Sequence, residues 1–103
     1  MPKYMLAYTG GSMPEGEEEQ KAVMDAWMGW FGQLGQAVVD GGAPFGPSST
    51  VGPDGGVAGG GSSGLTGYSV IEADSLDTAV AQAKGCPVLS AGGSVEVYEA
   101  IPM

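Results

Sequence analysis

The hydrophobic pattern of this chain changes its period from segment to segment, and this change constrains the possible folds most strongly. Residues 3–9 alternate as a strand does, with Tyr4, Leu6 and Tyr8 on one side and Met5 and Ala7 on the other. Both sides are apolar, which predicts a strand covered on both faces.

From Pro14 to Val39 the apolar residues instead recur at helical spacing. They form one stripe of Val23, Met24, Trp27, Phe31, Leu34 and Val38. Ser12-Met13-Pro14-Glu15 has the form of a capping box at the start, and Gly41-Gly42 provides a stop. Inside this predicted helix, Gly29 and Gly32 are either simply tolerated or allow another backbone to approach closely.

The remaining segments continue the alternation of strands and helices. Residues 43–51 contain Pro44 and Pro47, which limits them to a short or edge strand. Residues 65–73 form a strand, and a second helix follows Asp74 or Ser75 as its N-cap. Its predicted buried stripe is Leu76, Ala79, Val80 and Ala83, and Gly85-Cys86-Pro87 ends it.

A last strand over 94–101 turns Val95 and Val97 inward. The order is strand, helix, two strands, helix, strand. It predicts an α+β fold, a ferredoxin-like βαββαβ arrangement with an antiparallel sheet and both helices on one face.

Glycine is concentrated in one segment between the two middle strands. The chain has 20 glycines among 103 residues, and they are densest from Gly52 to Gly67. We expect one domain over residues 1–103 with a flexible glycine-rich loop at about 52–64. Pro53-Asp54-Gly55 is a turn within it. The loop is either a plain connector or a mobile flap over a pocket.

The charge balance excludes several classes of function. The net charge is −9, with 3 lysines and no His, and no Arg occurs in the printed sequence. We therefore expect neither nucleic acid nor an anionic membrane surface as a partner. Without His there is no Ser-His-Asp or Cys-His nucleophile, and one cysteine cannot build a zinc site, so no metal and no cofactor are expected. The single Cys86 cannot form an intrachain disulfide, and a cytoplasmic location is the default.

The four tyrosines suggest an apolar surface on the sheet. Tyr4, Tyr8, Tyr68 and Tyr98 all fall in predicted strands, and one register places them together on the face away from the helices, with Leu6, Val70, Glu72 and Glu96. Such a face does not stay in water in a small monomer. We therefore expect a homodimer that stacks sheet on sheet and encloses a cavity.

Glutamate and tyrosine in such a cavity are also the residues that proton transfer uses when His is absent. Glu72 or Glu96 would be the base and Tyr68 or Tyr98 the acid; the alternative is that the glutamates are solvated and the tyrosines pack. Cys86 is either a small buried hydrophobe or a nucleophile. The candidate ligand-binding residues are Tyr4, Tyr8, Trp27, Phe45, Ser48 and Tyr68.

Several segments resemble the YCII-related family, also called the DGPF-domain family. They are Lys3-Tyr4-Met5-Leu6, Gly46-Pro47, Leu65 to Glu72, Asp74-Ser75-Leu76-Asp77, Gly85-Cys86-Pro87 and Gly92 to Val97. The resemblance runs nearly the full length and implies a ferredoxin-like fold that forms dimeric α+β barrels. The family's activity is mostly unassigned, with a His-Asp pair suggested as catalytic in some members.

The chain departs from the family pattern at two places. In similar sequences a His often follows the Cys-Pro, where this chain has Val88. The Asp-Gly-Pro-Phe signature is absent, with Asp54-Gly55 as a remnant. The leading hypothesis is therefore a small molecule bound in a dimer cavity. The alternatives are a cofactor-free isomerase or lactone enzyme and a regulatory or interaction module.

Overall fold

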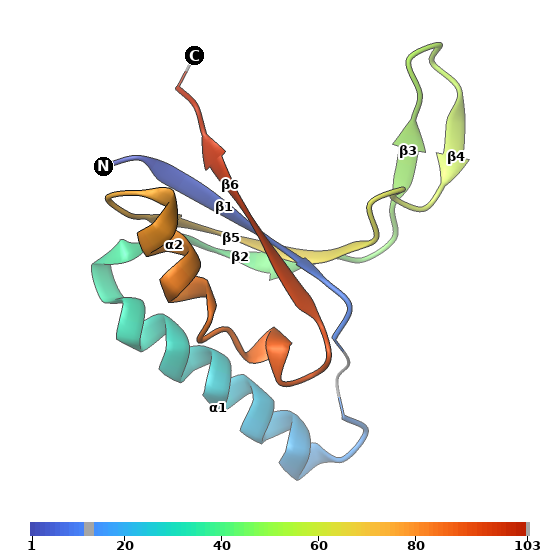
Figure 1. Ribbon diagram of the computed structural model, residues 1–103. Coiled ribbons are helices and arrows are strands. Elements are labelled where there is room, and N and C mark those ends of the chain that lie inside the picture. Colours follow the sequence, from blue (N-terminus) through green and yellow to red (C-terminus); the bar gives the residue numbers. More distant parts are fainter. Residues whose placement is uncertain (12–13, 103) are drawn as a thin grey trace.

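The computed structural model describes residues 1–11 and 14–102 and has an antiparallel sheet with two α-helices on one face (Figure 1). The strands of the sheet are β1 (Lys3–Thr9), β2 (Val38–Pro44), β5 (Leu65–Glu72) and β6 (Ser94–Ala100), in the order β2-β5-β1-β6. The helices are α1 (Glu17–Leu34) and α2 (Leu76–Ala83), with short 3-10 turns η1 (Gly35–Ala37) and η2 (Pro87–Leu89). This confirms the α+β, ferredoxin-like prediction.

A two-stranded hairpin is inserted between β2 and β5. Its strands are β3 (Ser49–Val51) and β4 (Val57–Gly59), and Figure 1 shows it standing away from the sheet. The predicted flexible loop therefore contains a regular strand, and Pro53-Asp54-Gly55 is the turn that joins the pair, as predicted. None of the six strand residues is buried.

Helix α1 is shorter than its apolar stripe predicts. It begins at Glu17 with Gly16 as N-cap, so Pro14 precedes the helix, and the side-chain amide of Gln20 donates to the Pro14 carbonyl at 2.8 Å. The predicted capping box depends on Ser12 and Met13, which lie outside the described residues. The helix ends at Leu34 because Gly35 adopts φ 57°.

The residues after η1 are extended rather than helical. Val38 belongs to β2 and pairs with Ile71, and Gly41-Gly42 lies inside this strand. The register slips between Asp40 and Ala43, and Gly42 takes φ 76° there. The stop predicted at Gly41-Gly42 is therefore wrong, because Gly35 ends the helix first and leaves the chain free to form the edge strand.

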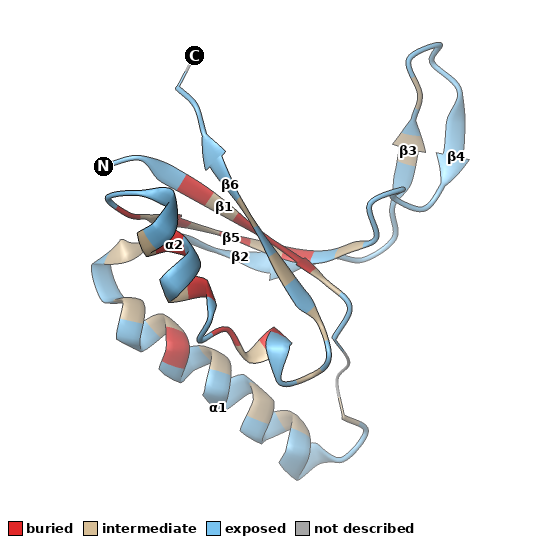
Figure 2. Cartoon of the chain, in the orientation of Figure 1, coloured by how far each residue is buried: buried red, intermediate tan, exposed pale blue. Residues whose placement is uncertain are grey.

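The core lies between the sheet and the helices (Figure 2). Trp30 is the buried residue of α1, and Trp27, Phe31 and Leu34 pack against the same core. Ala79 and Ala83 are the buried residues of α2, whereas Leu76 and Val80 of the predicted stripe are exposed. The two alanines let α2 approach the sheet closely, which leaves the larger side chains at its flanks.

The second helix begins where its sequence indicates. The Ser75 hydroxyl accepts a hydrogen bond from the Thr78 backbone N–H at 3.2 Å, which is an N-cap contact. Gly85 and Cys86 follow the helix, and Cys86 is buried. The structure thus selects Ser75 over Asp74 as the cap.

The tyrosines do not share one face of the sheet. Residues directly paired across strands lie on the same face, and Tyr4 pairs with Ile71 and Leu6 with Ser69, all of them buried under the helices. The prediction that Tyr4, Leu6 and Tyr8 lie on the face away from the helices is wrong. Both sides of β1 are apolar, so alternation alone could not decide which side faces the core.

The opposite side of the sheet, called the open face below, carries the residues predicted there from β5 and β6. Tyr68 pairs with Ala7, Val70 with Met5 and Glu72 with Lys3 in β1. On the other side of β1, Glu96 pairs with Ala7 and Tyr98 with Met5. The prediction that these residues of β5 and β6 share one face of the sheet is confirmed.

Candidate functional site

A cleft of about 1050 Å³ opens between α1 and the sheet and extends to the η2 segment. Its walls include Tyr8 of β1, Trp27 and Phe31 of α1, and Ser69 of β5. Small residues account for the space, since Gly10, Gly11, Gly29, Gly41, Gly42, Gly67, Gly85, Ala22, Ala26, Ala43 and Ala91 all line it. A volume of this size is ample for a small organic ligand.

Four aromatic rings form one connected group along this cleft. Tyr8 meets Trp27 edge-on with ring centres 5.2 Å apart, and Trp27 meets Trp30 edge-on at 5.8 Å. Phe31 packs at a tilt against both indoles. The Trp30 Nε1–H donates to the Gln82 carbonyl at 3.1 Å, which ties α1 to α2. Aromatic walls of this kind favour apolar and ring-shaped ligands.

The polar groups of the cleft form a short relay. The Tyr8 hydroxyl donates to Ser69 Oγ at 2.8 Å, and Ser69 Oγ donates to the Gly41 carbonyl at 2.7 Å. Burial raises the pKa of the Tyr8 hydroxyl far above its ordinary value, with the adjacent Cys86 thiol as a smaller cause. Tyr8 is therefore a neutral phenol at physiological pH.

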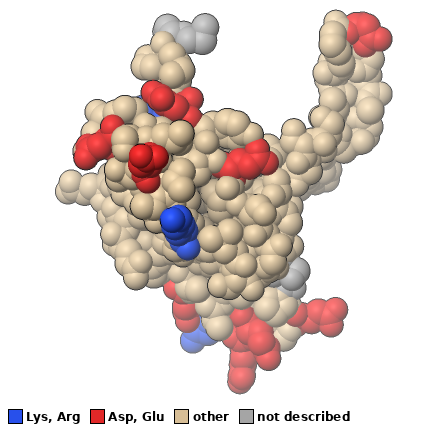
Figure 3. All heavy atoms as spheres, in the orientation of Figure 1, with Lys and Arg blue, Asp and Glu red and all other residues tan. Residues whose placement is uncertain are grey.

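The described lining of the cleft is uncharged. Among the described residues that line the cleft there is no Asp, Glu, Lys or Arg. Acidic residues gather instead at the amino end of α1, where Glu17, Glu18 and Glu19 occupy the first turn, at the lower end of the molecule in Figure 3. A ligand in the cleft would thus meet rings, small side chains and neutral polar groups.

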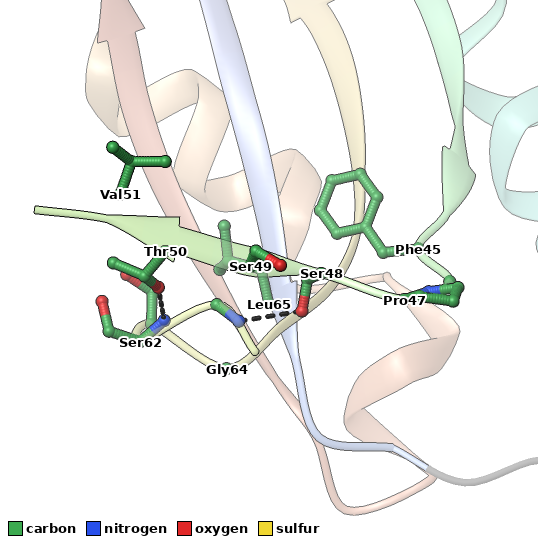
Figure 4. Close-up of a pocket in the computed structure, with 12 residues that line it drawn as sticks. Phe45, Pro47, Ser48, Ser49, Thr50, Val51, Ser62, Gly64 and Leu65 are labelled. Carbon is green, nitrogen blue, oxygen red and sulfur yellow. Dashed lines mark hydrogen bonds between the residues drawn. The ribbon is translucent and has the colours of Figure 1, made fainter. Parts of the chain in front are cut away.

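The predicted ligand-binding residues separate into three places. Tyr8 and Trp27 line the cleft; Tyr68 borders it at β5, but its ring lies on the open face and stacks on Phe45. Tyr4 is a core residue 2 % exposed. Phe45 and Ser48 line a second, smaller pocket of about 510 Å³ at the base of the hairpin (Figure 4). Sequence reasoning missed Ser69, Gly41 and the aromatic partner Phe31.

Two hydroxyls of the hairpin pocket, those of Ser48 and Thr50, already have partners within the hairpin. Ser48 Oγ accepts from the Gly61 N–H at 2.8 Å, and Thr50 Oγ1 accepts from the Ser62 N–H at 2.9 Å, as the dashed lines in Figure 4 show. Thr50 Oγ1 also donates to the Gly60 carbonyl at 2.8 Å. These bonds hold the glycine-rich return strand in place, which accounts for both side chains without a ligand.

The predicted acid–base residues lie on the open face, on the other side of the sheet from the core. The Tyr98 hydroxyl donates to the Glu96 carboxylate, and this bond is the main cause that raises the pKa of Tyr98. Glu72 lies across from Lys3 and apart from that pair. Tyr68 stacks on Phe45 at 5.7 Å and its hydroxyl donates to Asp40 at 3.3 Å. The structure thus joins Glu96 with Tyr98 only.

Cys86 is a buried core residue. It is 2 % exposed beside Tyr8, and burial raises the pKa of its thiol, which is the behaviour of a buried hydrophobe rather than a nucleophile.

Over residues 1–11 and 14–102, no group of three His, Cys, Asp or Glu side chains is placed to hold a metal ion. No helix within these ranges has the length and apolar character needed to span a membrane.

Comparison with known proteins identifies a family. The sequence model of the YCII-related domain matches residues 3–103. No curated protein matches the chain. The match covers every element described above.

Proposed function

Because this chain belongs to the YCII-related family, whose activity is mostly unassigned, we propose its function from the site: it binds a small, uncharged, partly apolar molecule in the cleft between α1 and the sheet. One observation carries the proposal. The cleft measures about 1050 Å³ and is walled by aromatic and small residues, with no charged side chain among the described ones.

The charge of the ligand follows from the cost of burying an ion. A charged group that leaves water for an apolar site needs an opposite charge or several hydrogen bonds. The described lining has no such charge, and the net charge of −9 repels anions in addition. The walls therefore favour a neutral ligand over a cationic or an anionic one.

The test is a titration of neutral, cationic and anionic small molecules monitored by tryptophan emission, since Trp27 and Trp30 both line the cleft. Val23→Phe on the inner side of α1 should intrude on the part of the cleft beside Trp27 and weaken binding at least about tenfold. Met28→Phe, on the exposed side of the same helix and outside the cleft lining, is the matched control. Binding that both variants leave unchanged would place the ligand elsewhere.

We also propose a homodimer that covers the open face. Met5, Tyr68 and Val70 are only partly buried there, and Tyr98 is 52 % exposed. A sheet-on-sheet dimer would cover these side chains and lies on the other side of the sheet from the cleft. The ligand site would then belong to a single chain rather than to a cavity shared between two chains.

The contact between Glu96 and Tyr98 favours a second candidate, the cofactor-free proton transfer of an isomerase or lactone enzyme. A dimer that closes over the open face would bring this pair into a cavity. If such an activity is found, Glu96→Gln should abolish it, whereas Glu72→Gln should not. A regulatory or interaction module, with the polar helix face or the glycine-rich loop as docking surface, is the third class, and a cytoplasmic location stays a prediction.

A further inference from the structure

We propose that the ligand of the cleft is a neutral ring compound that carries a hydrogen-bond donor, a phenol or indole rather than an ether, ketone or plain hydrocarbon. This inference rests on the proposed function, because it names the class of molecule that binds the same cleft. It depends on the direction of the relay from Tyr8 through Ser69 to Gly41.

The direction of hydrogen-bond donation along the relay follows from which groups carry a proton that they can donate. The Gly41 carbonyl can only accept, so Ser69 must donate its single proton to it, across 2.7 Å. Ser69 Oγ can then only accept from Tyr8, across 2.8 Å, and the Tyr8 proton is committed to that bond. The relay therefore has no proton left to donate to a ligand.

The relay still offers lone pairs. A phenol oxygen that donates its proton keeps acceptor capacity, and a carbonyl oxygen has two lone pairs, of which Ser69 uses one at Gly41. Cys86 lies beside the Tyr8 hydroxyl, but a thiol is a weak donor and does not compete with an O–H or N–H. Tyr8, Ser69 and Gly41 all line the cleft. The acceptors on this wall are the spare lone pairs of the exposed Gly41 and of Tyr8, which is 5 % exposed, whereas Ser69 is fully buried.

The aromatic part of the ligand follows from the walls beside the relay. The Trp27 ring lies edge-on to Tyr8, with ring centres 5.2 Å apart, and its plane makes an angle of 40° with the plane of Phe31. The aromatic rings that line the cleft therefore differ in orientation. Aromatic rings pack favourably in both arrangements. A flat molecule that contacts Trp27 would therefore lie beside the Tyr8 ring, and a donor on its rim would have the lone pairs of Tyr8 and Gly41 as acceptors.

The experiment compares three neutral probes of one shape by calorimetry: p-cresol has a donor, 4-methylanisole has only an acceptor, and toluene has neither. p-Cresol should bind about tenfold more tightly than the other two, the value of one net hydrogen bond. Tyr8→Phe should reduce this preference, with the Gly41 carbonyl left as an acceptor, and leave the affinity for toluene unchanged. Circular dichroism checks that each variant is folded.

A second variant reverses the polarity of the site. Ser69→Ala removes the acceptor of the Tyr8 proton, so the phenol becomes free to donate to a ligand. 4-Methylanisole should then gain affinity relative to p-cresol, an effect that a merely structural role of Ser69 would not produce. The preference for p-cresol retained in both folded variants would overturn the proposal.

The possible failures can be distinguished. If all three probes bind equally to the wild type and Val23→Phe weakens all of them, the cleft is a ligand site and only the donor class is wrong. If none of the three rings binds, the inferred ring class is wrong; if the titration of other neutral molecules also leaves the tryptophan emission of the folded chain unchanged, the proposed function itself is wrong.

Discussion

Tyr8 combines three roles in one side chain. Its ring packs on Trp27, its hydroxyl bonds Ser69, and its side chain lies beside Cys86 in the core. Sequence reasoning identified Tyr8 as a ligand-binding candidate but assigned it to the wrong face. The hydroxyl partner is 61 positions away in the chain, and no local pattern indicates a contact between residues so far apart.

Alkaline pH should destabilise this protein through the pair of Tyr8 and Cys86. Burial raises both pKa values above their ordinary values of 10.0 and 9.0, so the unfolded chain ionises first. The stability that the neutral groups provide is complete below about pH 9 and is lost as the pH rises toward the folded-state values. Urea unfolding at a series of pH values should show this fall.

The double variant Tyr8→Phe, Cys86→Ala should flatten the alkaline limb of that curve, because neither replacement side chain ionises. It should also lower the free energy of unfolding at neutral pH by about 1 to 3 kcal/mol, since the buried hydrogen bond to Ser69 is lost and a small cavity is left. An alkaline limb as steep as that of the wild type would show that other groups cause the loss.

At the scale of elements, the start and end of each segment depend on single residues with a special conformation. Ser75 begins α2, as its sequence predicts, because a serine followed by a helical pattern is a local signal. Gly35 ends α1, although Gly41-Gly42 looks like the stronger signal in the sequence. Both Gly35 and Gly42 take a positive φ, but Gly35 comes first and ends the helix, which leaves residues 38–44 free to pair with β5 as β2.

Glycine substitutions separate the required positions from the tolerated ones. A Cβ on Gly42 would lie 1.7 Å from the Tyr68 carbonyl oxygen, and φ is 76° there. Gly42→Ala should destabilise the fold by about 2 to 4 kcal/mol, through left-handed strain and overpacking. Chemical denaturation measures the difference.

Gly29→Ala on α1 is the matched control. A Cβ on Gly29 meets nothing within 4 Å, and alanine is the better helix former, so this variant should stabilise the fold by about 1 kcal/mol. The structure thus favours tolerance for Gly29 over the close backbone approach that its sequence position also allowed. Destabilisation of equal size in both variants would contradict this assignment.

For the whole molecule, the two faces of the sheet differ in how they are covered. The helices bury only one side of the sheet, and the hairpin extends away from it (Figure 1). Met5, Val70 and Tyr98 therefore meet solvent in the single chain, which is an unfavourable position for a small protein's apolar side chains. This situation favours self-association.

Light scattering over a range of concentrations should give a mass near twice the 10.2 kDa of one chain. Val70→Glu introduces a charge at the centre of the open face and should yield a folded monomer, because the charge would be buried without a partner. Val57→Glu, on the exposed hairpin, is the same substitution at a matched control site and should keep the dimer. A monomeric wild type would contradict the homodimer.

Much of the architecture could be predicted from the sequence. The switch between alternating and helical periods places β1, α1, β5, α2 and β6 in the right order, because secondary structure depends mostly on local periodicity. The absence of His and Arg, a property of composition alone, excludes several catalytic and anion-binding sites before any coordinates are considered. Periodicity is a local property of each segment, and composition is a sum over all residues, so neither depends on how the chain packs.

The choice of face and the cleft needed the tertiary structure. Both sides of β1 are apolar, so only the pairing of Tyr4 with Ile71 and of Leu6 with Ser69 shows which side the helices cover. The cleft joins α1 to β1, β2 and β5 through residues far apart in the chain, and its space results from small residues meeting there. Contacts of this kind arise only when the elements pack, because packing and not periodicity decides which surfaces meet.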